Sequence, residues 1–302
     1  MKNLTRRKFL KDCSLFVASA SLFGVVGCNK QSPKFKVGAM DASTGLNKKP
    51  EEMFKACAEI GMEGIQLSGA SVKSGIFIKD EDIAKFLELS KKYNVAISSV
   101  CAGGLNAAPL FILPNGVEHI KKAVDASVKL GAKNILVPSF GPANFRDKKT
   151  FRVSAENIKA YSAKIKEGVL YAKDKGITIS MENAFCADDN IAIINEVGLD
   201  NLKVYVDTMN LEYYGWKAPQ EISKLKNLIG EVHLKSLGHA HDSVNSKPLD
   251  MPACIDEIIK ANYQGWLIFE HHAFKKSEKF PTAIDCMKYN IAYVKNSKFF
   301  KV

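Results

Sequence analysis

The sequence lacks, near its start, a hydrophobic run long enough to cross a membrane. Its amino-terminal apolar stretch extends from Leu15 to Val26 and has twelve residues, whereas the core of a bilayer takes about 20. The basic segment Thr5-Arg6-Arg7-Lys8-Phe9-Leu10-Lys11 precedes this stretch, and Val25-Val26-Gly27-Cys28 ends it. The first segment matches the twin-arginine export pattern and the second matches a lipobox, a combination typical of a signal peptide.

These features predict that the first residues are an export signal and no part of the fold. We expect a twin-arginine signal peptide with a lipobox over residues 1–27 and a short linker over 28–33. Cys28 would be lipidated as the first mature residue. The protein would then lie in the periplasm or elsewhere in the cell envelope, and a lipid anchor would be its sole contact with a membrane.

The chain also lacks the cysteine pattern of a disulfide-stabilised protein. Outside the signal region the number of cysteines is odd, and no two have the CxxC spacing. Twin-arginine substrates fold in the cytoplasm before export, so their cores need no disulfides. We expect buried free thiols that pack as small apolar side chains. The cysteines concerned are Cys57, Cys101, Cys186, Cys254 and Cys286.

No run of basic residues occurs, although the formal net charge is +11. Loss of residues 1–27 removes five basic residues and one acidic residue and so lowers the charge by four, to +7. The lysines are scattered along helical segments, which indicates a solvated surface and no nucleic-acid partner. No Gly-x-Gly-x-x-Gly or Walker pattern follows the first expected strand, which argues against a nucleotide-binding sheet.

Short apolar stretches alternate with amphipathic stretches from Lys34 onwards. We expect eight strands, over residues 35–40, 64–67, 95–101, 134–139, 177–182, 204–207, 231–236 and 267–270. One of the helices between them carries Ile83, Phe86, Leu87 and Leu89, and the next has Ile120, Val124 and Val128 on one face. Strands that alternate with helices pair in parallel, and eight such units match the usual size of a barrel, about 250 residues. The sequence therefore predicts a single (β/α)8 TIM barrel over residues 34–302.

The last four expected strands each end on a side chain that can bind a metal ion. In a TIM barrel these carboxyl-terminal strand ends meet at one rim, where active sites lie. A single acid at a strand end is usually a helix cap or an ion-pair partner, but four consecutive strands repeat the pattern. The four residues are Glu182, Asp207, His233 and Glu270.

Three carboxylates that converge on one rim repel one another and are costly to bury unless a cation compensates them. A divalent metal ion provides that compensation. One imidazole and three carboxylates form a mixed nitrogen and oxygen site that suits Mn, Co, Mg, Fe or Zn without selecting among them. We therefore expect one divalent metal ion held by these four residues.

The strand-end motifs resemble the metal-site strands of the xylose isomerase-like superfamily, and within it the sugar phosphate isomerase/epimerase family and the ketose 3-epimerases. The motifs are Met181-Glu182-Asn183, Val206-Asp207-Thr208, Val232-His233-Leu234-Lys235 and Phe269-Glu270. The resemblance covers residues 34–297. It implies a metal ion that chelates the substrate's carbonyl and hydroxyl oxygens, with Glu182 and Glu270 as an acid/base pair on opposite faces of the sugar carbon. Such a pair removes a proton next to the metal-bound carbonyl and returns one from the other side.

Several further residues are candidates for substrate contacts. Where the family often has a histidine after the sixth strand, this chain has Asn210, which can hydrogen-bond a hydroxyl but cannot carry a proton. Asp188 stands where ketose epimerases have a second glutamate. Lys235 faces the same side of its strand as His233 and would either bind a substrate oxygen or pair with a metal-site carboxylate. His239 lies in the polar loop after the seventh strand, near the expected mouth.

The sequence favours an enzyme: an epimerase or isomerase of a non-phosphorylated sugar or keto-sugar, because phosphorylated metabolites are scarce outside the cytoplasm. A lyase or hydrolase of 3-keto-glycosides would use the same site. The competing class is a lipid-anchored carbohydrate-binding protein without catalysis, which would not need Glu182 and Glu270 together. The partner in each case is a small carbohydrate, and a homo-oligomer is compatible with the sequence.

Overall fold

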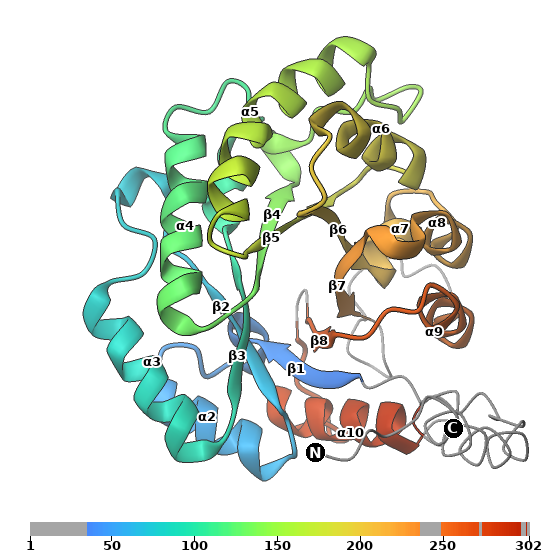
Figure 1. Ribbon diagram of the computed structural model, residues 1–302. Coiled ribbons are helices and arrows are strands. Elements are labelled where there is room, and N and C mark those ends of the chain that lie inside the picture. The colour runs from blue at the N-terminus through green and yellow to red at the C-terminus, as the bar shows by residue number, and fades with distance from the viewer. Residues whose placement is uncertain (1–34, 236–248, 272–273, 297–299, 301–302) are drawn as a thin grey trace, which may run out of the picture. The chain divides into compact units, whose positions relative to one another are not determined.

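The computed structural model describes residues 35–235, 249–271, 274–296 and 300. Within them, eight parallel strands close into a barrel in the order β1 to β8, and β8 pairs with β1 (Figure 1). The predicted single (β/α)8 barrel is thereby confirmed. The expected signal peptide and linker, including Cys28, lie outside the described residues. No helix in the described part is both long enough and apolar enough to span a bilayer.

The strands are close to their predicted positions. They are β1 (Lys36–Met40), β2 (Gly64–Ser68), β3 (Ala96–Cys101), β4 (Asn134–Ser139), β5 (Thr178–Asn183), β6 (Leu202–Asp207), β7 (Ile229–Leu234) and β8 (Trp266–Phe269). The largest differences are at β6 and β7, which each begin two residues before the expected start. Gly230 interrupts the hydrophobic pattern at the beginning of β7. It is needed there because a Cβ atom would lie 2.1 Å from the Ser180 hydroxyl.

Helices follow the strands around the outside of the barrel (Figure 1). The α-helices are α2 (Pro50–Glu59), α3 (Asp80–Tyr93), α4 (Gly116–Leu130), α5 (Ala155–Lys173), α6 (Ala187–Val197), α7 (Thr208–Tyr213), α8 (Ala218–Leu225), α9 (Met251–Lys260) and α10 (Ala283–Asn296). Short 3-10 turns are η1 (Asp41–Thr44), η2 (Val72–Ser74), η3 (Gly103–Ala107), η4 (Gly141–Ala143) and η5 (Lys226–Leu228).

Two apolar residues of the expected helices are exposed. Leu87 on α3 is 41% exposed and Val128 on α4 is 48% exposed, whereas Ile83 and Ile120 are buried. For Val128 the reason is helical drift. At 3.6 residues per turn, a residue eight positions after Ile120 lies about 80° away from it around the helix axis, so Val128 has rotated out of the interface with the barrel.

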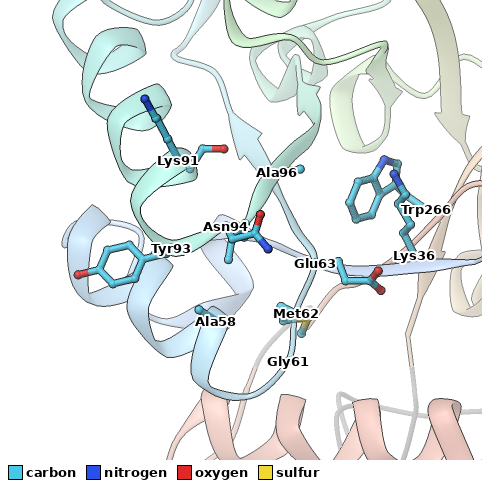
Figure 2. A pocket seen from close by; sticks show the side chains of 12 residues that line it. Lys36, Ala58, Gly61, Met62, Glu63, Lys91, Tyr93, Asn94, Ala96 and Trp266 are labelled. Atoms are coloured by element: carbon cyan, nitrogen blue, oxygen red, sulfur yellow. The ribbon is translucent and has the colours of Figure 1, made fainter.

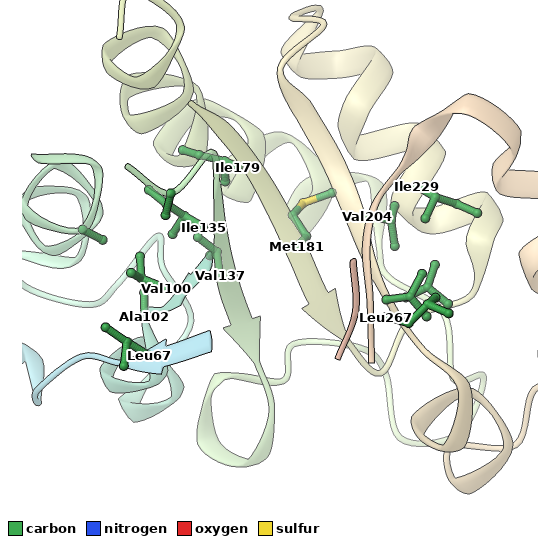
Figure 3. Close-up of a cluster of buried hydrophobic side chains, with 14 of the residues drawn as sticks. Leu67, Val100, Ala102, Ile135, Val137, Ile179, Met181, Val204, Ile229 and Leu267 are labelled. Carbon is green, nitrogen blue, oxygen red and sulfur yellow. The ribbon is translucent and has the colours of Figure 1, made fainter. Parts of the chain in front are cut away.

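The two faces of the strands bury different kinds of side chain. Side chains such as Ile135, Val137, Ile179 and Met181 point outward and form the main hydrophobic core against the helices (Figure 3). Alternate residues point into the barrel, as the period of two requires. Much of this interior is polar, where bulky branched side chains usually dominate. Its buried polar members include Gln66, Ser99, Asn134, Ser180, Tyr205 and Glu231.

The five cysteines in the described part are buried free thiols, as expected. Burial raises the pKa of the Cys57 thiol to about 12, which keeps it protonated and inert.

Candidate active site

Four strands bring the predicted metal ligands to one end of the barrel. Glu182 is next to last in β5, Asp207 ends β6, His233 is next to last in β7 and Glu270 follows β8 directly. The sheet register sets Asp207 beside His233 across β6 and β7. One ligand atom of each residue lies within 4.8 Å of those of the other three. We call these four residues the ligand cluster.

One ring nitrogen of His233 is at the centre of the ligand cluster. Its Nδ1 lies 2.9 Å from Glu270 Oε2, 3.2 Å from Glu182 Oε1 and 3.8 Å from Asp207 Oδ2. Nitrogen and oxygen ligands bind first-row metals at about 2.0–2.2 Å, so ligand atoms that share one ion are about 3.0–3.5 Å apart. The separations to Glu270 and Glu182 are close to this range and that to Asp207 is slightly longer, so a small shift of the Asp207 carboxylate would let all of them share one divalent cation.

The two carboxylate oxygens of Asp207 make different contacts. Oδ1 accepts hydrogen bonds from the backbone N–H groups of Met209, at 2.9 Å, and Asn210, at 2.8 Å, and so caps the first turn of α7. Oδ2 faces the ligand cluster, where Lys235 approaches it. The helix cap thus holds the carboxylate in one orientation, with the second oxygen directed at the site.

Lys235 pairs with metal-site carboxylates, which is one of the two roles the sequence left open. Its Nζ lies 2.8 Å from Asp207 Oδ2 and 2.7 Å from Glu270 Oε2, and the residue is 7% exposed. It also donates to Asn210 Oδ1 at 3.3 Å. Without a bound metal ion, Lys235 and a protonated His233 would together balance two of the three negative charges of the cluster.

The pKa shifts follow from burial and from these contacts. Burial would lower the pKa of His233, but the carboxylates of Glu270 and Glu182 raise it to about 10. Burial raises the pKa of Asp207 to about 7, against the opposing effect of Lys235. For Glu270 the effect of burial is outweighed by Lys235 and His233, which hold its pKa below the usual range. Perturbed titratable groups that lie together in a buried cluster are typical of functional sites.

Asn210, in α7, contacts the ligand cluster, and Tyr214 follows one turn later. Asn210 Nδ2 donates to Glu182 Oε1 at 3.2 Å, so its amide links Glu182 to Lys235. The ring of Tyr214 stacks on Phe140, with centroids 5.9 Å apart, and the Arg146 guanidinium lies 4.9 Å from its centroid. These contacts fix the Tyr214 ring in place.

The structure does not bring every predicted substrate residue to the cluster. Asp188 lies in the first turn of α6, half exposed, where its Oδ2 accepts from Lys224 Nζ at 3.0 Å. His239 lies outside the described residues. His271, next to Glu270, is buried and its backbone N–H donates to Ser43 Oγ at 2.9 Å.

Two residues near the cluster were not predicted from the sequence. Gln66 on β2 is hydrogen-bonded to the far ring nitrogen of His233, with Gln66 Oε1 and His233 Nε2 2.9 Å apart. Arg146, in the loop between β4 and α5, donates to the backbone oxygens of Ala184, at 2.8 Å, and Tyr214, at 3.2 Å. A polar residue inside the apolar strand β2 was the available signal for Gln66. No feature of the sequence around Arg146 indicates its role.

A large hollow lies at the other end of the barrel and is distinct from this site. It has a volume of about 610 Å³ and is lined by residues at the amino-terminal ends of strands, among them Lys36, Glu63, Ala96 and Trp266 (Figure 2). Active sites of TIM barrels lie at the opposite rim, at the carboxyl-terminal ends of the strands. The size of this hollow is therefore no guide to the active site.

A family model for the xylose isomerase-like TIM barrel matches residues 54–290. The match includes the whole ligand cluster and most of the barrel. The chain therefore belongs to this family, as its strand-end motifs had led us to expect.

Two relatives of similar sequence are named as epimerases. The 3-dehydro-D-guloside 4-epimerase of Escherichia coli (strain K12) is 22% identical over 235 residues, which are 72% of this chain and 86% of that enzyme. The 2-epi-5-epi-valiolone 7-phosphate 2-epimerase of an Actinoplanes species is 24% identical over 185 residues, which are 60% of this chain and 66% of that enzyme.

Solved structures of similar fold include two epimerases. The 3-keto-D-glucoside 4-epimerase from E. coli, in its apo form, has a TM-score of 0.69 at 18% identity and covers 87% of this chain and 100% of its own. The D-allulose 3-epimerase from a Methylomonas species, in complex with D-allulose, has a TM-score of 0.67 at 16% identity. The match covers 87% of this chain and 97% of that enzyme. At these identities the comparison establishes the shared fold.

Proposed function

We propose that this protein is a divalent-metal-dependent epimerase or isomerase of a non-phosphorylated sugar or keto-sugar. The observation that carries the proposal is the buried ligand cluster, in which two glutamates flank one histidine nitrogen at 3.2 Å and 2.9 Å. Family membership and the names of the relatives support the reaction class. A divalent cation bound there would polarise a substrate carbonyl and stabilise negative charge on its oxygen.

Glu182 and Glu270 are the proposed acid/base pair. They belong to strands β5 and β8, which β6 and β7 separate in the closed barrel, so their carboxylates enter the site from different sides. One glutamate would remove a proton from the carbon next to the carbonyl, and the other would return a proton to the opposite face, which inverts that carbon. The contacts of Glu270 with Lys235 and His233 keep it ionised but also weaken it as a base, and release of Lys235 to a substrate oxygen would restore its basicity.

Lys235 and Asn210 are the proposed groups for substrate oxygens. Both are already engaged with cluster carboxylates, Lys235 with Asp207 and Glu270 and Asn210 with Glu182. Lys235 and Asn210 can therefore turn to a substrate hydroxyl or oxyanion. The carboxylates that they release would still be compensated by a bound cation. Asp188, from the resemblance, and His239, from its place in the loop after the seventh strand, remain proposals from the sequence alone.

A keto-glycoside is the substrate class that the relatives favour, because one acts on a 3-dehydro-glycoside by name and a protein of similar fold is a 3-keto-D-glucoside 4-epimerase. Removal of a proton next to a ketone can also expel a glycosidic oxygen from the neighbouring carbon. The same site would then act as a lyase on a 3-keto-glycoside. Product analysis separates the two: an epimerase retains the glycosidic bond, and a lyase releases the aglycone.

The test is solvent exchange at a sugar carbon. The mature chain with Mn²⁺ would be incubated in D₂O with free keto-sugars and 3-keto-glucosides, and deuterium incorporation followed by proton NMR. We expect incorporation with the wild type, a loss of at least about 100-fold in Glu182→Gln and Glu270→Gln, and no change in Glu257→Gln, whose carboxylate pairs with Lys260 on α9. Exchange at the wild-type rate in both cluster variants would refute the assignment. Sugar binding without any exchange would instead establish a carbohydrate-binding protein.

We also propose that the chain is exported and lipidated at Cys28, on the strength of the twin-arginine segment and lipobox alone. Arg6→Lys together with Arg7→Lys should retain the protein in the cytoplasm. Cys28→Ser should release it from the membrane fraction and abolish labelling by a radioactive fatty acid. A membrane-bound Cys28→Ser variant would refute the anchor.

A further inference from the structure

A hydrogen-bonded set of polar side chains fills the barrel beneath the ligand cluster. We call it the polar column; its members come from six strands and are Gln66, Ser99, Asn134, Ser180, Tyr205 and Glu231. All six are buried. Buried polar groups are costly unless every one of them is paired. Because an apolar interior would avoid this cost, we expect the polar column to have a role that apolar side chains could not fill.

The carboxylate of Glu231 sets the direction of the hydrogen bonds in the column. Its Oε1 accepts from the hydroxyls of Ser99, at 2.7 Å, and Tyr205, at 3.1 Å. Its Oε2 accepts from the amide of Asn134 at 2.9 Å. Because Ser99 and Tyr205 have one proton each and donate it to Glu231, their oxygens are left as acceptors for any other partner.

That other partner is Gln66, whose side-chain amide is thereby oriented. Its Nε2 donates to Ser99 Oγ and to Tyr205 OH, each at 2.9 Å, and so uses both amide protons. A flipped amide would take the hydroxyl protons for its own oxygen and leave Glu231 Oε1 buried without a donor, at a cost that the observed orientation avoids. The carbonyl oxygen Oε1 of Gln66 must therefore face His233.

A carbonyl oxygen can only accept, so the Nε2 atom of His233, 2.9 Å away, must carry the proton. In a neutral imidazole the other nitrogen, Nδ1, then has the free lone pair. That nitrogen is the one that faces Glu182, Asp207 and Glu270. The column thus determines which nitrogen of the ring can bind a metal ion.

We propose that Gln66, oriented by the polar column, is a positioning residue that holds His233 with Nε2 as hydrogen-bond donor and Nδ1 as the metal ligand. The inference rests on the proposed metal site. Outer hydrogen-bond partners of metal-binding histidines fix the ring and its tautomer, and their loss typically weakens metal binding by about 10- to 100-fold. Here the partner is an amide on β2, whose own orientation comes from Glu231 on β7 through two hydroxyls.

The test compares two substitutions of Gln66 that differ in one property. Gln66→Met removes the acceptor for His233, whereas Gln66→Glu keeps an acceptor there; both lose the donation to Ser99 and Tyr205 and both should lower the melting temperature. We expect Mn²⁺ affinity, measured by electron paramagnetic resonance of the free ion, to fall about 10- to 100-fold in Gln66→Met and to be retained in Gln66→Glu. A control is Asn201→Leu, which removes two hydrogen bonds from an amide at the far end of the barrel and should leave Mn²⁺ affinity unchanged.

A second measurement needs no variant to fold. In the wild type loaded with Zn²⁺, ring-nitrogen NMR should show His233 with a proton on Nε2 and the metal on Nδ1. A metal on Nε2, wild-type Mn²⁺ affinity in Gln66→Met, or equal losses in Gln66→Met and Gln66→Glu would overturn the positioning role alone. A wild type that binds neither ion would overturn this inference and the metal dependence of the proposed function together.

Discussion

Metal binding to the ligand cluster should release a measurable number of protons. In the protein without metal, the pKa of His233 is raised to about 10 by Glu270 and Glu182 and that of Asp207 to about 7 by burial. A metal ligand must be deprotonated. At pH 7.5 nearly every His233 and about a quarter of Asp207 would carry a proton, so binding should release about 1.2 protons per chain.

The sign of the pH dependence follows from this count. The free site holds more protons than the metal-bound site, so a rise in pH favours the bound form. Between about pH 7.5 and 9 the release stays near one proton, and Mn²⁺ affinity should rise about tenfold per pH unit. The rise should level off as the pH passes the pKa of His233, at about 10.

The assay is isothermal titration calorimetry of Mn²⁺ in three buffers with different ionisation enthalpies. The slope of the observed enthalpy against the buffer enthalpy gives the number of protons released, and a titration of Mn²⁺ into EDTA in the same buffers calibrates it. A release below about 0.3 protons at pH 7.5 would show that His233 is neutral in the metal-free protein. The proposal that Lys235 and a protonated His233 together balance two of the three carboxylate charges would then be refuted.

Three further substitutions test the site and the fold. Lys235→Met removes a positive charge next to two cluster carboxylates, so Mn²⁺ affinity should rise at least about tenfold while turnover of a keto-sugar falls. Gly38→Ala places a Cβ atom 2.8 Å from the backbone oxygen of Gly64, and this overpacking should destabilise the barrel by about 1–3 kcal/mol in urea denaturation. Arg152→Met leaves the buried Asp189 carboxylate without its two-pronged ion pair; because Arg152 is half exposed, we expect a loss of about 2 kcal/mol in the same assay.

The two stability variants have matched controls. Gly103→Ala meets no atom nearer than 3.9 Å and should change stability little. Lys164→Met breaks an exposed pair with Glu167 and should cost no more than about 0.5 kcal/mol. Equal losses in a variant and its control would contradict the roles of packing and burial at these positions. Weaker Mn²⁺ binding by Lys235→Met would contradict the charge repulsion expected between Lys235 and a bound cation.

The sequence by itself determined the architecture and the ligand cluster. Both depend on local patterns: a period of two in the strands, a period near 3.6 in the helices, and a polar residue at the carboxyl end of each late strand. Parallel strands in one barrel have their carboxyl ends at the same rim, so Glu182, Asp207, His233 and Glu270 needed no further information to be grouped. The exposed Val128, eight residues after the buried Ile120, shows the limit of such periodicity, because a small drift per turn accumulates along a helix.

Only the tertiary structure decided how the polar residues are partnered. Gln66 and His233 are 167 positions apart, and they meet because both side chains point into the closed barrel, in which β8 and β1 lie between β7 and β2. The pairing of Lys235 with two carboxylates and the turn of Asp188 toward Lys224 likewise depend on strand register and on helix placement. Local periodicity indicates which face a side chain occupies but not which distant side chain lies opposite. That choice is made when the barrel closes and each buried donor or acceptor must find a partner.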